Sequence, residues 1–220
     1  MSERNTRRAG AEGRPRRAQG RATRERILAA ASELFSDGGY EATSLRQIAA
    51  QAKIDLATLK YHYGDKAALF LEIYAQGHRA YEEALGPLLL RLGAVESAAE
   101  LRAELPALVA EVHAHLASNL PFVRMTLYRM LEAPESIIER EEQIQDQLIG
   151  VISGALEGLG RRGLIRRGVD PRGVAVTLIA SFAMLFVSTR TKPGLLGPPA
   201  RDPARFEAFF VDLLDQLLLD

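Results

Sequence analysis

The stretch TSLRQIAAQAKIDLATLKYHYGDK, from Thr43 to Lys66, decides the fold of this 220-residue chain. Its apolar residues recur at helical spacing in two groups, which predicts two short helices that share one small core. The first group is Leu45, Ile48 and Ala49, and the second is Ile54 and Leu59. Two such helices joined by a tight connection form a helix-turn-helix.

The ends of these two helices carry capping signals. Ser44 and Gln47 form a capping-box pattern, whereas Thr43 would cap with its hydroxyl alone, so the first helix starts at either Thr43 or Ser44. Asp55 is placed to accept backbone N–H bonds at the start of the second helix, over residues 56–62. In a helix-turn-helix the second helix enters the DNA major groove, so base contacts are expected from its exposed front.

The longer segment LFSDGGYEATSLRQIAAQAKIDLATLKYHYGDKAALF resembles the DNA-binding domain of the tetracycline-repressor-like (TetR) transcriptional regulators. The resemblance covers about residues 22–70 and implies an all-α fold, with an N-terminal helix-turn-helix domain and a C-terminal helical domain for effector binding and dimerisation. The matching residues are Phe35, Gly39, Tyr40, Thr43, Ser44, Ile48, Ala49, Thr58, Leu59, His62, Tyr63 and Lys66.

Two residues depart from the family pattern. Lys53 stands where the family usually has glycine in the turn, a position that tends to need a left-handed backbone at a cost of about 1–2 kcal/mol for a non-glycine residue. Lys60 replaces a commonly aromatic residue in the second helix. The sequence leaves open whether Lys60 contacts a phosphate, a base edge or only solvent.

Composition excludes several classes of protein. A hydrophobic content of 47% is enough to bury a core, and the absence of cysteine excludes disulfides and thiolate metal sites and suits a reducing cytoplasm. The N-terminus is arginine-rich without an apolar segment, which is atypical of a secretory signal. The longest apolar run, Val174 to Val187, is shorter than the ~20 residues of a membrane span, so no membrane partner is expected.

The net charge is zero, but the charges are unevenly distributed. Residues 1–66 hold 13 basic and 8 acidic residues, a net charge of +5, and the remainder carries −5. Such asymmetry is typical of a DNA-facing end and an acidic body, although solvated charge on a neutral protein gives the same totals.

We divide the chain into three parts. Residues 1–21 are polar and arginine-rich and should be disordered when free, either as a flexible tail or as an arm that follows DNA phosphates. Residues 22–66 form the DNA-binding domain, beginning with an amphipathic helix that Gly38 and Gly39 terminate. Residues 67–220 form the effector-binding and dimerisation domain.

Further helices follow. A long helix over residues 66–85 should link the two domains, with Gly86 and Pro87 ending or bending it. The later helices are expected over residues 98–119, 121–132, 136–159, 171–189 and 203–219.

Eight residues are candidates for DNA contact. Thr43 and Tyr61 should bond phosphates, Arg46, Thr58 and Lys60 could reach base edges, and Lys53, His62 and Lys66 should meet the backbone. Each also has a purely structural interpretation as a cap, a packing residue or a helix-end charge.

The resemblance implies an effector pocket between the long linking helix and its neighbours. A mixed apolar set with a few polar groups is typical of such sites, although residues of these types at helical spacing are more often ordinary core. The candidates are Tyr74, His78, His113, Phe122, Met125, Tyr128 and Phe182.

The last two helices are more apolar than one packing face requires. Two from each protomer would form a four-helix interface, the dimerisation mode that the resemblance implies, with packing inside the subunit as the alternative. The interface candidates are Leu178, Phe182, Leu185, Phe186, Phe206, Phe209, Phe210, Leu213 and Leu217.

Catalysis has little support in the sequence. His113 and His115 point to different sides of a helix, and neither a zinc-binding histidine motif nor a glycine-rich phosphate loop occurs. We therefore expect no enzyme, no metal and no cofactor. The hypothesis is a homodimeric repressor that binds a palindromic DNA operator and is released by a small-molecule effector. An architectural DNA-binding protein without an effector, or a small-molecule-binding dimer with a non-functional helix-turn-helix, are the alternatives.

Overall fold

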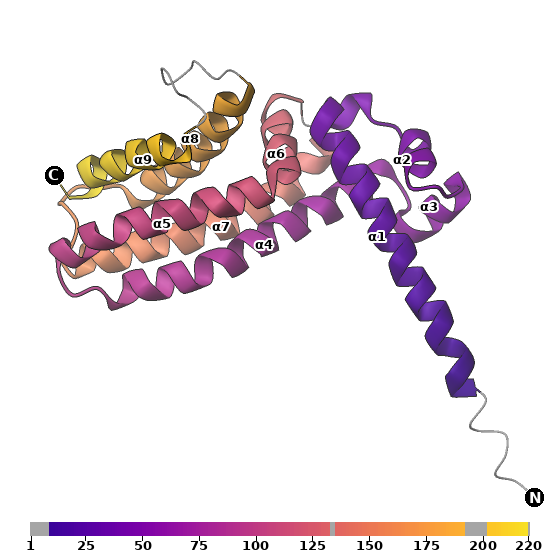
Figure 1. The fold of residues 1–220 in the computed structure, drawn as a ribbon, viewed down its shortest axis with the longest axis horizontal. Coiled ribbons are helices and arrows are strands. Elements are labelled where there is room, and N and C mark those ends of the chain that lie inside the picture. Colours follow the sequence, from indigo (N-terminus) through magenta and orange to yellow (C-terminus); the bar gives the residue numbers. More distant parts are fainter. Residues whose placement is uncertain (1–8, 133–134, 192–201, 220) are drawn as a thin grey trace, which may run out of the picture.

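The computed structural model describes residues 9–132, 135–191 and 202–219, and these residues form helices without any strand (Figure 1). A small group of helices at the N-terminal end sits at one end of an elongated helical body. The predicted all-α fold is confirmed.

Three helices form the N-terminal group: α1 (Ala9–Ala42), α2 (Leu45–Gln51) and α3 (Leu56–Tyr63). The regular α1 helix is interrupted at Gly39, whose φ of 77° is left-handed and suits glycine, as expected for a terminating residue. At its other end α1 differs from the expected disorder of residues 1–21, because the helix already begins at Ala9. Residues 1–8 of that predicted arm lie outside the described part.

The turn between α2 and α3 has the predicted caps. Ser44 is the N-cap of α2 in a complete capping box with Gln47, and Asp55 caps α3 by accepting from the Thr58 N–H at 2.6 Å. Lys53 adopts the left-handed conformation with φ 55°. The Lys53 and Ile54 N–H groups donate back to the Ala50 and Ala49 carbonyls, so the turn is a Schellman motif with lysine at the usual glycine position.

Helix α4 (Lys66–Ala94) runs from the N-terminal group along the body (Figure 1). It is longer than predicted, because it continues through Gly86 and Pro87 instead of ending there. Proline removes one helical hydrogen bond. Pro87 and the residue four positions earlier, Glu83, both lie on the exposed face, where water can reach the released carbonyl, and the helix therefore persists.

The body adds α5 (Ala98–Ser118), α6 (Leu120–Glu132), α7 (Glu135–Arg161), α8 (Pro171–Thr191) and α9 (Pro203–Leu218). Helix α7 packs along α4 and α8, and α5 packs on α9. The short helix α6 lies between the body and α1 and packs closely on α1 (Figure 1). The body therefore touches the N-terminal group mainly through α4 and α6.

Two clusters of buried side chains hold these parts together. The first joins α1 to α4 around Phe35, Ile48, Leu59 and Phe70 and also includes Phe122 of α6. The second joins α5, α7, α8 and α9. Because the first cluster continues into α6 and α7, the N-terminal group is anchored on the body by apolar contacts as well as by the chain itself.

Helix α8 corrects one estimate from the sequence. The apolar run 174–187 is too short for a membrane span, but with its flanking residues Pro171–Arg190 has the length and composition of one, the single such helix among the described residues. In this fold α8 packs on α7, α6 and α5. Core helices of water-soluble proteins have the same composition.

Candidate DNA-binding surface and ligand cavity

The outer face of α3 presents two side chains to solvent. Lys60 is exposed, and Tyr61 is 85% exposed, with its ring against the edge of His62 at a centroid distance of 5.3 Å. Leu59 and Tyr63 are buried on the opposite side, so helical periodicity alone turns Lys60 and Tyr61 outward. Two more predicted contact residues, Arg46 on α2 and Lys53 in the turn, are also exposed.

Thr58 and His62 are half-buried on α3. The Thr58 hydroxyl donates to Asp55 Oδ2 at 3.1 Å, which leaves its oxygen as an acceptor only. These bonds from Thr58 lower the pKa of Asp55, so the capping carboxylate stays ionised well below neutral pH. Thr58 therefore belongs to the cap and stands at the front of the helix at the same time.

Two of the predicted DNA contacts, Thr43 and Lys66, make contacts within the subunit. Thr43 is only 4% exposed, and its hydroxyl donates to the Gly39 carbonyl at 2.8 Å and lies 3.2 Å from the Leu34 carbonyl. The Lys66 Nζ donates to the Tyr40 carbonyl at 2.9 Å and lies 4.1 Å from the centroid of the Tyr40 ring. Both side chains tie the end of α1 to its neighbours, because the chain turns there and leaves carbonyl groups without helical partners.

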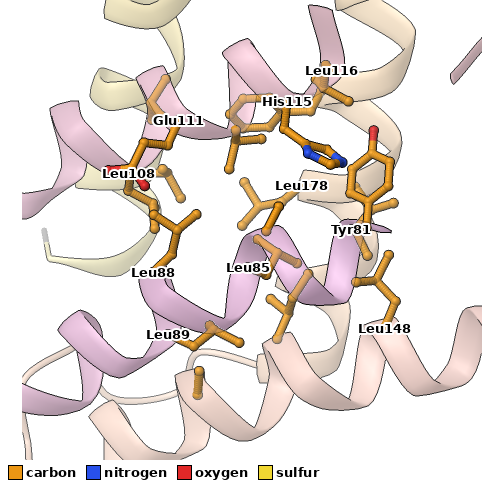
Figure 2. Close-up of a pocket in the computed structure, with 18 of the residues that line it drawn as sticks. Tyr81, Leu85, Leu88, Leu89, Leu108, Glu111, His115, Leu116, Leu148 and Leu178 are labelled. Carbon is orange, nitrogen blue, oxygen red and sulfur yellow. The ribbon is translucent and has the colours of Figure 1, made fainter. Parts of the chain in front are cut away.

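An apolar cavity of about 180 Å³ lies inside the body, between α4, α5, α6, α7, α8 and α9. Of its 29 lining residues, 24 are apolar, and leucines dominate. Figure 2 shows Leu85, Leu88 and Leu89 from α4 facing the cavity, with Leu108 opposite and the Tyr81 and His115 rings together at one side. Such a concave apolar space with few polar groups is the usual form of a small-molecule site.

Only three of the seven predicted ligand contacts line this cavity: His78, Phe122 and Phe182. Tyr74 and Met125 are buried in the core between the N-terminal group and α6, and Tyr128 lies against α1. His113 packs between Phe186 and Phe206 and pairs with Glu207 at 2.7 Å on the side of α5 that faces α9. Its position two residues from His115 turns it away from the cavity.

The polar lining groups gather around Phe122. The Tyr81 and His115 rings are 4.4 Å apart between centroids, and the His78 and Phe122 rings are 5.5 Å apart. Burial and the positive charge of Arg129 lower the pKa of His78 to about 4, and burial also lowers the pKa of His115. Both imidazoles are therefore uncharged at neutral pH.

Helix α6 connects this cavity to α1. Phe122 lines the cavity near the start of α6, and further along the same helix Arg124 Nη1 lies 2.9 Å from Asp37 Oδ1 of α1. The Tyr128 hydroxyl lies 3.4 Å from the Asp37 carbonyl oxygen. A change in the position of Phe122 can thus reach α1 through one rigid helix.

Known proteins share the helix-turn-helix and much of the rest of this chain. Residues 27–73 match the family model described as bacterial regulatory proteins, tetR family. The HTH-type transcriptional repressor NicS of Pseudomonas putida is 27% identical over 172 residues, which cover 76% of this chain and 77% of NicS. The N-terminal segment of this chain therefore matches the DNA-binding segment of TetR-family regulators. The resemblance inferred from the sequence is confirmed, and the match to DNA-binding regulators agrees with the expectation that the chain is not an enzyme.

Solved structures share the fold of this chain over most of its length. A regulator named FadR from Bacillus subtilis, in complex with stearoyl-CoA, has a TM-score of 0.68 at 16% identity, covering 86% of this chain and 96% of that chain. A regulator from Saccharomonospora viridis in complex with choline has a TM-score of 0.66 at 20% identity, covering 90% and 97%. A complex of SmeT with triclosan has a TM-score of 0.64 at 21% identity, covering 90% of this chain and 93% of that chain.

The predicted interface residues divide into two groups. Phe182, Phe186, Phe206 and Phe210 are buried within the subunit, where they stack together and pack on α5. Phe209 remains 42% exposed, and the last four are half-buried: Leu178, Leu185, Leu213 and Leu217. The internal alternative therefore holds for the four buried phenylalanines. The exposed apolar side chains of α8 are instead Val176 and Met184.

Sequence reasoning missed most of the cavity. Tyr81, His115 and Thr126 were not predicted as ligand contacts, nor were the leucines of α4 and α5. The signal available was the apolar content of α4 and α5, which exceeds one helical stripe. Several other helices could have covered that surplus, so the sequence alone did not distinguish a cavity from solid core.

Proposed function

We propose that this TetR-family regulator is a homodimeric repressor that binds a palindromic operator through α3 and releases it when a small molecule fills the cavity. One relationship supports this above all: helices α4 and α6 both line the apolar cavity and both contact the N-terminal group that holds the exposed helix α3. In the proposed division, residues 22–66 carry the DNA contacts and residues 67–220 carry effector and dimer functions. Because it binds operator DNA, the proposed repressor acts in the cytoplasm.

The contact surface that we propose centres on α3. Lys60 and Tyr61 point outward from it, Thr58 stands at its front, and His62 flanks it. Arg46 and Lys53 add positive charge at the side of α2. Phosphate contacts from such cations position a helix-turn-helix, and side chains at the front of the second helix read bases.

The release mechanism follows from the size of the cavity. A volume of about 180 Å³ is below the ~300–1,000 Å³ of most small-molecule sites, so an effector must widen it. Widening favours a state in which α4 and α6 have moved apart. Since α6 holds Asp37 and α4 follows α3 directly, that state carries α3 at a different angle. A ligand shifts the equilibrium only as far as it binds this state more tightly.

We propose that dimerisation uses the exposed sides of α8 and α9. Val176, Met184 and Phe209 are 43%, 54% and 42% exposed, an unusual concentration of large apolar side chains on two neighbouring helices. A twofold dimer would place two copies of α3 on successive major grooves, about 34–36 Å apart.

The test is selection of duplexes from a random pool, followed by fluorescence anisotropy with the selected DNA across salt concentrations. The proposal expects a palindromic site, an affinity that falls steeply with salt, and relief by at least one metabolite. Salt-dependent binding that no ligand relieves would favour an architectural protein. A complete lack of DNA binding at low salt would leave only a small-molecule-binding dimer.

A further inference from the structure

The cavity contains hydrogen-bonding groups without a fixed charge. Among its 29 lining residues none is lysine or arginine. The single carboxylate, Glu111, already pairs with Arg91, whose Nη2 lies 2.7 Å from Oε1. An ionic group on a ligand would therefore lose its hydration without gaining a counter-ion, which is costly in an apolar site.

One polar side chain in the wall lacks a partner. His78 is 95% buried, being only 5% exposed, and neither of its ring nitrogens has a hydrogen-bond partner in the described structure. A neutral imidazole offers one donor and one acceptor, and leaving both unsatisfied in a buried position costs free energy. Both nitrogens have essentially no accessible surface, so a ligand supplies the missing partner only as it widens the cavity at His78.

The other polar lining groups lie near His78. Tyr81 is one turn further along α4, His115 packs on the Tyr81 ring, and Thr126 is one turn after Phe122. The Thr126 hydroxyl already donates to the Phe122 carbonyl at 3.0 Å, so it offers a ligand acceptor capacity only. The polar end of the cavity is thus on the side of the N-terminal helices.

The rest of the cavity is long and apolar. Its lining on α4 runs from His78 to Leu92, and 14 residues of helix correspond to roughly 20 Å. A volume of about 180 Å³ along that length has room for a narrow molecule. The lining at the far end is mostly leucine from α4 and α5, including Leu88, Leu101 and Leu105, with the Arg91-paired Glu111 beside Leu108 (Figure 2).

We propose that the effector is an elongated, uncharged, apolar molecule with a hydroxyl or carbonyl group, which hydrogen-bonds His78 and Tyr81 while the tail lies among the leucines of α4 and α5. This inference rests on the proposed function and names the chemical class of its ligand. Binding at the His78 end also brings the ligand against Phe122, the first cavity residue of α6.

The experiment compares three probes with one alkyl tail: 1-decanol, decanoate and decylammonium at pH 7.5, titrated below their micelle concentrations by calorimetry and thermal shift. We expect 1-decanol to bind saturably and at least tenfold more tightly than either ion. The His78→Phe and Tyr81→Phe variants should each weaken 1-decanol binding about three- to tenfold, the worth of one hydrogen bond. Ala155 lines the cavity, so Ala155→Trp should fill it and weaken the binding of all three probes.

Equal or tighter binding of decanoate would overturn the proposal in favour of an anion site, and tighter binding of decylammonium would do so in favour of Glu111. Saturable binding that Ala155→Trp leaves unchanged, or no saturable binding of any probe, would also overturn it. DNA affinity for the selected duplex is measured separately without probe. If decanoate binds more tightly and the operator is still released, only the proposed ligand class is refuted. If the protein binds no duplex, the proposed function is refuted.

Discussion

The ring of Phe122 on α6 packs on the backbone of Gly77 on α4, in the space that a side chain at residue 77 would need. His78, the next residue, lines the cavity, as does Phe122 itself. The closest approach of α4 and α6 is therefore part of the cavity wall, and residue 77 controls how closely the two helices can meet.

Substituting Gly77→Ala should separate these helices. Overpacking costs about 1–3 kcal/mol, which exceeds the ~1 kcal/mol that alanine gains over glycine in a helix. We expect a lower free energy of unfolding in urea and weaker operator binding, because α6 is displaced as it would be by an effector. Gly93→Ala, also in α4 but with open space around it and no proline after it, is the control and should not destabilise the protein. Unchanged stability and DNA affinity in Gly77→Ala would contradict this role.

Substituting Lys60→Ala should remove one cation from the proposed DNA surface. If Lys60 contacts a phosphate, the slope of log affinity against log salt falls by about 1 and all duplexes are weakened alike. If it reads a base edge, sequence preference changes at one position instead. Anisotropy titrations on the selected site and on point variants of it distinguish the two results, and no change in either measurement would exclude Lys60 from the contact surface.

Lys66→Ala should act mainly on stability. Its Nζ donates to the Tyr40 carbonyl and lies over the Tyr40 ring, and a hydrogen bond with a cation–π contact is worth about 1–2 kcal/mol in total. We expect the urea midpoint to fall, with a salt slope of DNA binding equal to that of the unmodified protein. A reduced slope with unchanged stability would return Lys66 to the list of phosphate contacts.

His78 should make stability depend on pH. Its folded-state pKa of about 4 is below the usual 6.5, so the unfolded chain takes up this proton first as the pH falls. The contribution of neutral His78 to the free energy of unfolding is complete above pH 6.5 and declines towards pH 4. The decline amounts to about 2 kcal/mol between pH 7.5 and 5.0. Urea unfolding at these two pH values should show a larger loss in the unmodified protein than in His78→Phe. Equal losses would mean that His78 is protonated as readily when folded.

Charges on α8 and α9 should dissociate the proposed dimer. Met184→Glu combined with Phe209→Glu places charge on exposed apolar positions, so the subunit should stay folded and sediment as a monomer in analytical ultracentrifugation. Leu90→Glu, on an exposed position of α4, is the matched control and should leave the dimer intact. Phe210→Glu, in contrast, should unfold the chain because Phe210 is fully buried. A double variant that remains dimeric would move the interface elsewhere.

Thr43 and Ser44 are neighbours, but only the role of Ser44 could be predicted from the sequence. The capping box of Ser44 with Gln47 and the cap at Asp55 were readable because each joins residues three positions apart. The hydroxyl of Thr43 bonds to carbonyl oxygens four and nine residues earlier, at the end of α1, and no local pattern separates that role from a phosphate contact. The same holds for Lys66, whose partner is 26 residues away.

The sequence by itself determined the helix-turn-helix and the all-helical character of the body, because caps, turns and apolar periodicity act between neighbouring residues. Only the tertiary structure decided that four phenylalanines of α8 and α9 are internal and that His78, Tyr81 and His115 meet around one cavity. An apolar helical face requires burial but does not specify its partner. That choice depends on how six helices fill space together.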